Sequence, residues 1–98
     1  MEIGERVVIA DNVYVGDNFH GHARRDIPII DQYMRSPGPV SIGGGTWIGT
    51  GACILANVRI GKNCVIGSNA VVTKDVPDFH VAVGIPARVL RTVDGAPA

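Results

Sequence analysis

The sequence predicts an all-β protein, a parallel β-helix of about three coils with one projecting loop. Three observations carry this prediction: a period of six residues, an Ile or Val at the first position of every repeat, and a second small or apolar position four residues later. Ordinary strands repeat every two residues and α-helices about every 3.6, so a period of six indicates short parallel strands separated by regular bends.

The repeats fall into two runs, each opened by an Ile or Val lead residue. Three strands and three bends close one triangular coil of 18 residues, so residues 3–20 form one coil and residues 40–77 form two. β-branched residues favour strands, and the glycine after many leads lets the backbone turn without a Cβ clash. Nine leads in register argue against the alternative, a β-sandwich with accidental spacing. The leads are Ile3, Ile9, Val15, Ile42, Ile48, Ile54, Ile60, Ile66 and Val72, and the second inward positions are Val7, Val13, Phe19, Thr46, Ala52, Val58, Cys64, Ala70 and Val76.

The repeat is interrupted once and then ends, within a single domain of residues 1–98. Residues 21–39, which contain Pro28, Pro37 and Pro39, leave the coils as a projecting loop. Because loops on a rigid scaffold carry many binding and catalytic groups, this loop is either functional or a tolerated surface insertion. Residues 78–98 form a C-terminal strand and tail, with the strand turning at Pro86 and covering the unpaired edge of the last coil.

Composition excludes several classes of partner. Nine acidic and nine basic residues balance, so the chain has no electrostatic footprint for nucleic acid. The sequence contains no basic amphipathic stretch, long apolar run or secretion signal. We therefore expect a cytoplasmic protein that does not associate with a membrane. Cys53 and Cys64 occupy packing positions of the repeat and are expected to be reduced.

Three stretches give the sequence a family resemblance. They are residues 38–49 (GPVSIGGGTWIG), 70–77 (AVVTKDVP) and 83–91 (VGIPARVLR). With these motifs the chain resembles the hexapeptide-repeat acyltransferases, and most of all their maltose, galactoside and capsular-sugar O-acetyltransferase branch. The resemblance implies a left-handed winding and acetyl-CoA as the acyl donor. It also implies a sugar-like small-molecule acceptor, whose hydroxyl or amine receives the acetyl group, and a homotrimer with its sites between neighbouring β-helices.

The resemblance also assigns residues to CoA. A narrow groove admits the extended pantetheine arm only beside short side chains, which Gly49, Gly51 and Gly67 provide. Ammonium and guanidinium groups suit the phosphates. The assigned residues are Thr50 and Ser68 for the pantetheine arm, Thr73 and Lys74 for the adenine end, and Lys74, Arg88 and Arg91 for the phosphates.

Acetyl transfer to a hydroxyl needs a base, and imidazole suits that role. Related sugar acetyltransferases carry a motif Asp-His-x-His-Gly before the loop, and the corresponding residues 17–21 read Asp-Asn-Phe-His-Gly. Asn18 therefore replaces the first histidine of the motif, and an amide cannot accept a proton at neutral pH. We expect His20 to be the catalytic base, with His22 as the second candidate, and we expect His80 to be structural or exposed.

Two alternatives stay open. The substitution at Asn18 is compatible with a non-catalytic CoA-binding or assembly module of the same fold. A γ-type carbonic anhydrase would need three histidines around zinc, two of them on successive turns. Residues 49–52 and 55–58, which occupy such turns, contain no histidine, so no metal is expected.

Overall fold

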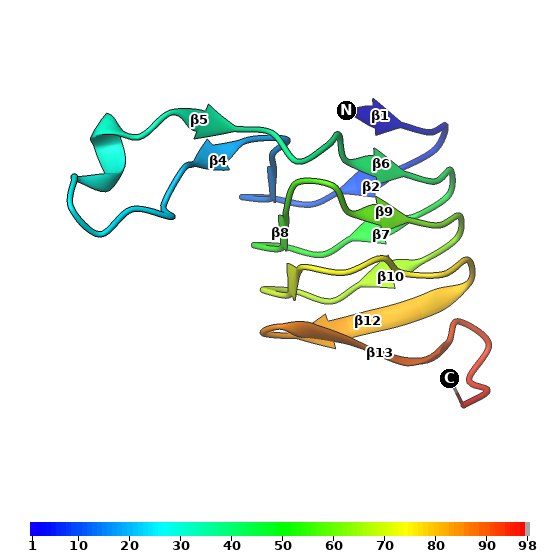
Figure 1. The fold of residues 1–98 in the computed structure, drawn as a ribbon. Coiled ribbons are helices and arrows are strands. Elements are labelled where there is room, and N and C mark those ends of the chain that lie inside the picture. The colour runs from blue at the N-terminus through cyan, green and yellow to red at the C-terminus, as the bar shows by residue number, and fades with distance from the viewer. Residues whose placement is uncertain (98) are drawn as a thin grey trace.

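The computed structural model describes residues 1–97 and shows a stack of triangular coils with an arm at one side (Figure 1). Each coil contributes one two-residue strand to each of three parallel sheets, so the strands of one sheet come from successive coils. Sheet A contains β1, β6 and β9; sheet B contains β2, β7, β10, β12 and β13; and sheet C contains β3, β8 and β11. The strand bounds are β1 Glu2–Ile3, β2 Val8–Ile9, β3 Tyr14–Val15, β6 Ser41–Ile42, β7 Trp47–Ile48, β8 Cys53–Ile54, β9 Arg59–Ile60, β10 Val65–Ile66 and β11 Val71–Val72.

The lead residues stack in register, as the repeat predicts. Ile42 pairs with Ile3 in one neighbouring coil and with Ile60 in the other. Because side chains alternate along a strand, the lead residue points inward and its predecessor outward. The leads of the second and third coils are at most 2% exposed, and together they form the centre of the hydrophobic core.

The second inward position of each repeat is also buried throughout the second and third coils. Thr46 is the one polar residue buried there among residues 1–97. Its hydroxyl donates a hydrogen bond to the Gly61 carbonyl at 2.9 Å and accepts one from the Cys64 amide at 3.1 Å. Both polar functions of the hydroxyl are therefore satisfied inside an otherwise apolar core.

Seven of the nine repeats turn through a residue with a left-handed backbone, three positions after the lead. Glycine and asparagine adopt this conformation at the lowest cost, and they fill most of these positions. The residues are Arg6, Asn12, Gly45, Gly51, Asn57, Asn63 and Asn69, with φ between 50° and 75°. This Gly/Asn ladder is a second sequence signal of the fold, beside the six-residue spacing of the lead residues.

The two ends of the coil stack differ. At the C-terminal end, β12 (His80–Gly84) pairs in parallel with β10, and β13 (Ala87–Thr92) pairs antiparallel with β12. The expected final strand and the turn near Pro86 are present, and the residues after the turn form a second strand. At the other end, the inward Ile3 and Ile9 are 44% and 42% exposed, since the first coil has a neighbour on one side only within residues 1–97.

The projecting segment, which we call the arm, is a two-stranded ribbon with a turn of 3-10 helix at its tip. β4 (Phe19–His20) pairs antiparallel with β5 (Met34–Arg35), and η1 spans Ile29–Asp31. The arm extends away from the coils (Figure 1). Phe19, predicted to point into the core, is instead 40% exposed in β4. The ribbon pairing draws Phe19 and His20 out of the first coil, so the segment outside the repeat begins two residues earlier than the 21–39 boundary.

Candidate functional site

The two candidate catalytic histidines come together in one cleft at the base of the arm, which we call the His20 cleft. It has a volume of about 370 Å³. One wall comes from the arm, with His20 and His22, and the other from the corner that follows β8, with Leu55 and Ala56. These two segments are far apart in the sequence, and the stacking of coils brings them together. The lining residues are Tyr14, Gly16, Asn18, Phe19, His20, His22, Leu55 and Ala56.

Within this cleft the histidines differ in their surroundings. The ring of His22 packs beside the ring of Phe19, with centroids 5.6 Å apart and planes tilted by 38°. His20 is paired with Met34 across the ribbon. Both imidazoles are exposed to solvent and both line the cleft. Asn18 lines the same cleft, so the residue that replaces the first histidine of the motif lies beside both candidates.

His80 lies outside this cleft, at the start of β12. Its Nδ1 is 2.8 Å from the backbone carbonyl of Asp78. The prediction that His80 is structural or exposed agrees with this local contact.

Thr50 and Ser68 stack on each other at one corner of the coils, between sheets B and C. The Asn69 amide donates a hydrogen bond to the Thr50 carbonyl at 2.8 Å, which holds the two coils together there. A Cβ on Gly49 would lie 2.8 Å from the Ser68 nitrogen, so only glycine fits at that position. Both Thr50 and Ser68 are exposed, and this corner is available to an extended ligand.

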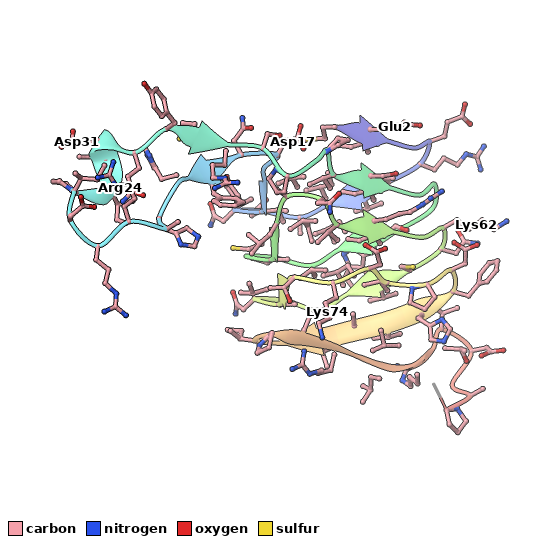
Figure 2. All side chains as sticks on the ribbon, viewed as in Figure 1. Glu2, Asp17, Arg24, Asp31, Lys62 and Lys74 are labelled. Atoms are coloured by element: carbon pink, nitrogen blue, oxygen red, sulfur yellow. The ribbon has the colours of Figure 1, made fainter. Side chains whose placement is uncertain are left out.

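The remaining candidates lie at other places on the solenoid. Thr73 and Lys74 follow β11 at the corner between sheets C and A, the same corner at which His20 leaves the first coil. Lys74 and Arg88 line one cleft of about 360 Å³ at the C-terminal end of the stack, and Figure 2 shows Lys74 beside β12 and β13. Arg91, opposite Val81 in the β12–β13 pairing, does not line that cleft.

Asp17 fixes the base of the arm. One carboxylate oxygen, Oδ1, accepts a hydrogen bond from the Val40 amide at 2.9 Å, and Oδ2 is 3.1 Å from the amino group of Met1. The Ser36 hydroxyl donates to the Asp17 carbonyl at 3.0 Å. Hydrogen bonding from Val40, followed by the contact with the amino group, lowers the pKa of the Asp17 carboxyl below its ordinary value. The residues before and after the arm are thus joined through one charged side chain.

Two further properties of residues 1–97 bear on the site. No group of three or more histidine, cysteine, aspartate or glutamate side chains in that range gathers in a way that could hold a metal ion. No helix there has the length and apolar character needed to cross a membrane.

Three further residues that the sequence motifs do not single out contribute to the clefts. Leu55 and Ala56 form a wall of the His20 cleft, and Arg35 borders a neighbouring cleft of the arm. Leu55 departs from the glycine that follows most leads, and this substitution is the one local sign that its corner differs from the others. No local pattern marks Arg35.

Comparison with known proteins connects the repeat with a family. Residues 39–74 match the family described as bacterial transferase hexapeptide (six repeats). The chain is 43% identical over 91 residues to a probable acetyltransferase of Mycobacterium tuberculosis, covering 93% of this chain and 30% of that protein. It is 38% identical over 95 residues to the galactoside O-acetyltransferase of Escherichia coli K12, covering 94% of this chain and 44% of that protein.

A solved structure of galactoside acetyltransferase in complex with coenzyme A has the same fold. It superimposes with a TM-score of 0.84 and 40% identity, covering 93% of this chain and 44% of that one. The chain therefore spans less than half the length of these relatives. The repeat, the three parallel sheets and these similarities agree with the left-handed parallel β-helix expected above, and residues 39–74 carry the repeat of the bacterial transferase hexapeptide family.

Proposed function

We propose that this chain carries a CoA-dependent acetyltransferase site that moves an acetyl group from acetyl-CoA to a hydroxyl of a sugar-like acceptor. The observation that carries the proposal is the His20 cleft, in which two imidazoles face a mostly apolar pocket beside the corner of Thr73 and Lys74. The similarity to galactoside acetyltransferase, solved with coenzyme A, supports the choice of donor.

His20 acts as the general base in this proposal. Its imidazole takes the proton of the acceptor hydroxyl while the oxygen attacks the thioester carbonyl carbon. The carbon–sulfur bond then breaks, the sulfur leaves with a proton, and the products are an acetyl ester and free CoA. Backbone amides near residues 49–51 are candidates to stabilise the negative charge on the thioester oxygen. His22 is the second candidate for the base.

The proposed site combines corners of two copies of the chain. Thr50 precedes β8 and Leu55 follows it, so these two residues lie at opposite edges of sheet C. The five-residue step from Thr50 to Leu55 spans up to about 17 Å when extended. The corner of Thr50 and Ser68 and the corner of His20 therefore lie at opposite edges of one face. A neighbouring copy that places its His20 corner beside Thr50 completes a groove, with Lys74 and Arg88 near the phosphates.

Outward side chains support assembly into a homotrimer. On sheets B and C the outward positions are largely apolar, and Val8, Tyr14 and Trp47 are 60%, 52% and 54% exposed. On sheet A they are Glu2, Ser41 and Arg59. Burying the apolar faces against sister copies removes this surface from water, and a closed ring satisfies every copy equally.

A thiol-release assay tests the catalytic role of His20. Galactose and related sugars are offered with acetyl-CoA, and free CoA is measured. We expect His20→Ala to lower the rate by about 10²–10⁴-fold, the usual loss when a general base is removed. His80→Ala serves as the matched control and should keep the wild-type rate, since His80 lies outside the cleft. Equal rates for His20→Ala and wild type, with His22→Ala inactive, would assign the base to His22.

Binding of acetyl-CoA is measured separately by thermal unfolding. At a ligand concentration of one hundred times Kd, the folded state gains about 2.7 kcal/mol if only that state binds. His20→Ala should keep this stabilisation. Stabilisation without thiol release in wild type would support the second candidate function, a non-catalytic CoA-binding module, which the presence of Asn18 in the cleft favours. No stabilisation would contradict both functions.

A further inference from the structure

A second cleft of the arm adjoins the His20 cleft. It has a volume of about 450 Å³, and we call it the arm cleft. Phe19 and His22 line both clefts, so the two spaces meet at this pair of rings. The lining residues of the arm cleft are Phe19, His22, Ala23, Met34, Arg35, Ser36 and Pro37.

The charge of the arm cleft comes from one residue. Its lining contains Arg35 and no carboxylate. Elsewhere in the arm, the guanidinium of Arg24 is already paired with the carboxylate of Asp26. Within residues 1–97 the guanidinium of Arg35 forms neither an ion pair nor a hydrogen bond. Arg35 also lines a third cleft, of about 330 Å³, together with Asp31, and no ion pair joins Arg35 to Asp31. The donors of Arg35 are therefore available to a ligand.

The position of Arg35 relates it to the proposed base. In the β4–β5 pairing Arg35 lies opposite Phe19, one residue from His20. Successive side chains of a strand point to opposite faces, so Arg35 shares a face of the ribbon with Phe19 and not with His20. The two clefts meet at Phe19 and His22, and a molecule of the size of a monosaccharide can reach there from the His20 cleft into the arm cleft. A guanidinium presents a planar fork of donors that matches carboxylate and phosphate oxygens in a bidentate arrangement.

We propose that the acceptor is an acidic sugar whose carboxylate or phosphate binds Arg35 in the arm cleft while its reacting hydroxyl lies beside His20. This inference rests on the proposed function and adds the substrate class to it. Arg35 acts as a specificity-determining residue: it holds the acidic group of the acceptor and takes no part in the transfer of the acetyl group or the proton. A neutral sugar has no group for this guanidinium.

The test compares three probes that share one sugar: galactose, galactose 1-phosphate and galacturonate. Dissociation constants are measured by calorimetry and turnover by thiol release, both at fixed ionic strength. We expect one or both acidic probes to bind and turn over about five- to tenfold better than galactose, as a well-oriented charge-assisted contact in a partly exposed cleft provides. The two acidic probes distinguish a phosphate-bearing acceptor from a carboxylate-bearing one.

Variants separate the role of Arg35 from general charge. Arg35→Gln should abolish the preference, so that the acidic probes and galactose give dissociation constants within about twofold of one another, and Arg35→Lys should keep part of it. Arg25→Gln is the matched control, because Arg25 is an exposed arginine of the same arm that lines neither cleft. It should keep the full preference.

Each outcome decides between the two proposals. A wild-type preference below about twofold, or a preference that survives Arg35→Gln, overturns the inference. Absence of thiol release with all three probes contradicts the proposed function, and the dissociation constants then still decide whether Arg35 selects acidic sugars.

Discussion

At Gly43, which follows the lead Ile42, the distance between coils leaves no room for a side chain. A Cβ on Gly43 would lie 2.5 Å from the Gly61 carbonyl carbon and 2.5 Å from the Lys62 nitrogen. These are backbone atoms of the next coil, which hydrogen bonds hold in place, as from the Gly43 amide to the Ile60 carbonyl at 2.8 Å. The neighbouring Gly44 is less constrained, since its Cβ would meet the Glu5 carbonyl oxygen at 3.1 Å.

A pair of substitutions tests this constraint. We expect Gly43→Ala to lower the free energy of unfolding by about 1–3 kcal/mol, the range for overpacking a rigid interior. Gly44→Ala should cost clearly less, because one contact has to lengthen by a few tenths of an ångström. Urea denaturation of both variants measures the difference. Equal losses for the two variants would show that the spacing of coils adapts to a methyl group.

Among the elements, the arm depends most on a single side chain. β4 and β5 form a ribbon of two residue pairs, which is too short to be stable alone in water. Asp17 joins the chain before the arm to Val40 after it, and Figure 2 shows Asp17 where the arm meets the coils. The geometry of both clefts therefore depends on this contact.

The pH dependence of this contact follows from the lowered pKa of Asp17. A group whose pKa is lower in the folded state stabilises that state above its unfolded value, here 3.8, and loses the effect as pH falls through the folded value. In wild type we expect the Val40 amide resonance to titrate only below about pH 3.8. In Asp17→Asn it should not titrate, although the amide oxygen still accepts the hydrogen bond.

Removing the side chain altogether should loosen the arm. In Asp17→Ala, we expect backbone order parameters over residues 19–35 to fall toward about 0.6, the range of flexible loops, while those of the coils stay near 0.85. Relaxation measurements at neutral pH check this. An arm as rigid as in wild type would indicate that the ribbon is held by other contacts.

At the scale of the whole molecule, one face of the prism is polar and two are apolar outside. The described chain is elongated, with extents of 49 × 25 × 22 Å. Its core is thin, because each strand contributes a single inward lead residue to it. Such a thin core leaves much apolar surface on sheets B and C. The proposed homotrimer covers this surface and brings Thr50 of one copy toward His20 of the next.

Two lysine substitutions, at equivalent outward positions on different faces of one coil, test the proposed homotrimer. Cys53 and Ser41 are outward residues of half-buried exposure in the second coil, on sheets C and A respectively. We expect Cys53→Lys to shift the trimer toward monomers, because burying an unpaired ammonium group is costly. Ser41→Lys should leave the trimer intact. Analytical ultracentrifugation distinguishes the two, and dissociation by Ser41→Lys alone would place the interface on sheet A.

Much of the scaffold was predictable because its pattern is local and repeated. Ile48 and Ile66 occupy the same place in their repeats and stack in register, so one rule accounts for both. At the first coil the repeat predicts burial less well, since the lead residue Ile9 occupies an inward position and is still 42% exposed. Burial depends on which coil lies next, and a repeat motif does not specify that.

The clefts were not predictable in the same way. His20 was identified from its motif, but Leu55 and Arg35 joined it or its neighbour only in three dimensions. Phe19 fits the repeat and nevertheless lies outside the core, where it pairs with Arg35 in the ribbon.

By itself, the sequence of this protein determined the coil, the inward residues of the second and third coils and, to within two residues, the place of the interruption, because contacts at a fixed spacing of 18 residues depend on a short repeated pattern. Only the tertiary structure decided the shape of the arm and the residues that share its clefts. Those contacts join segments of unrelated spacing, and their energies depend on how the ribbon packs against the coils.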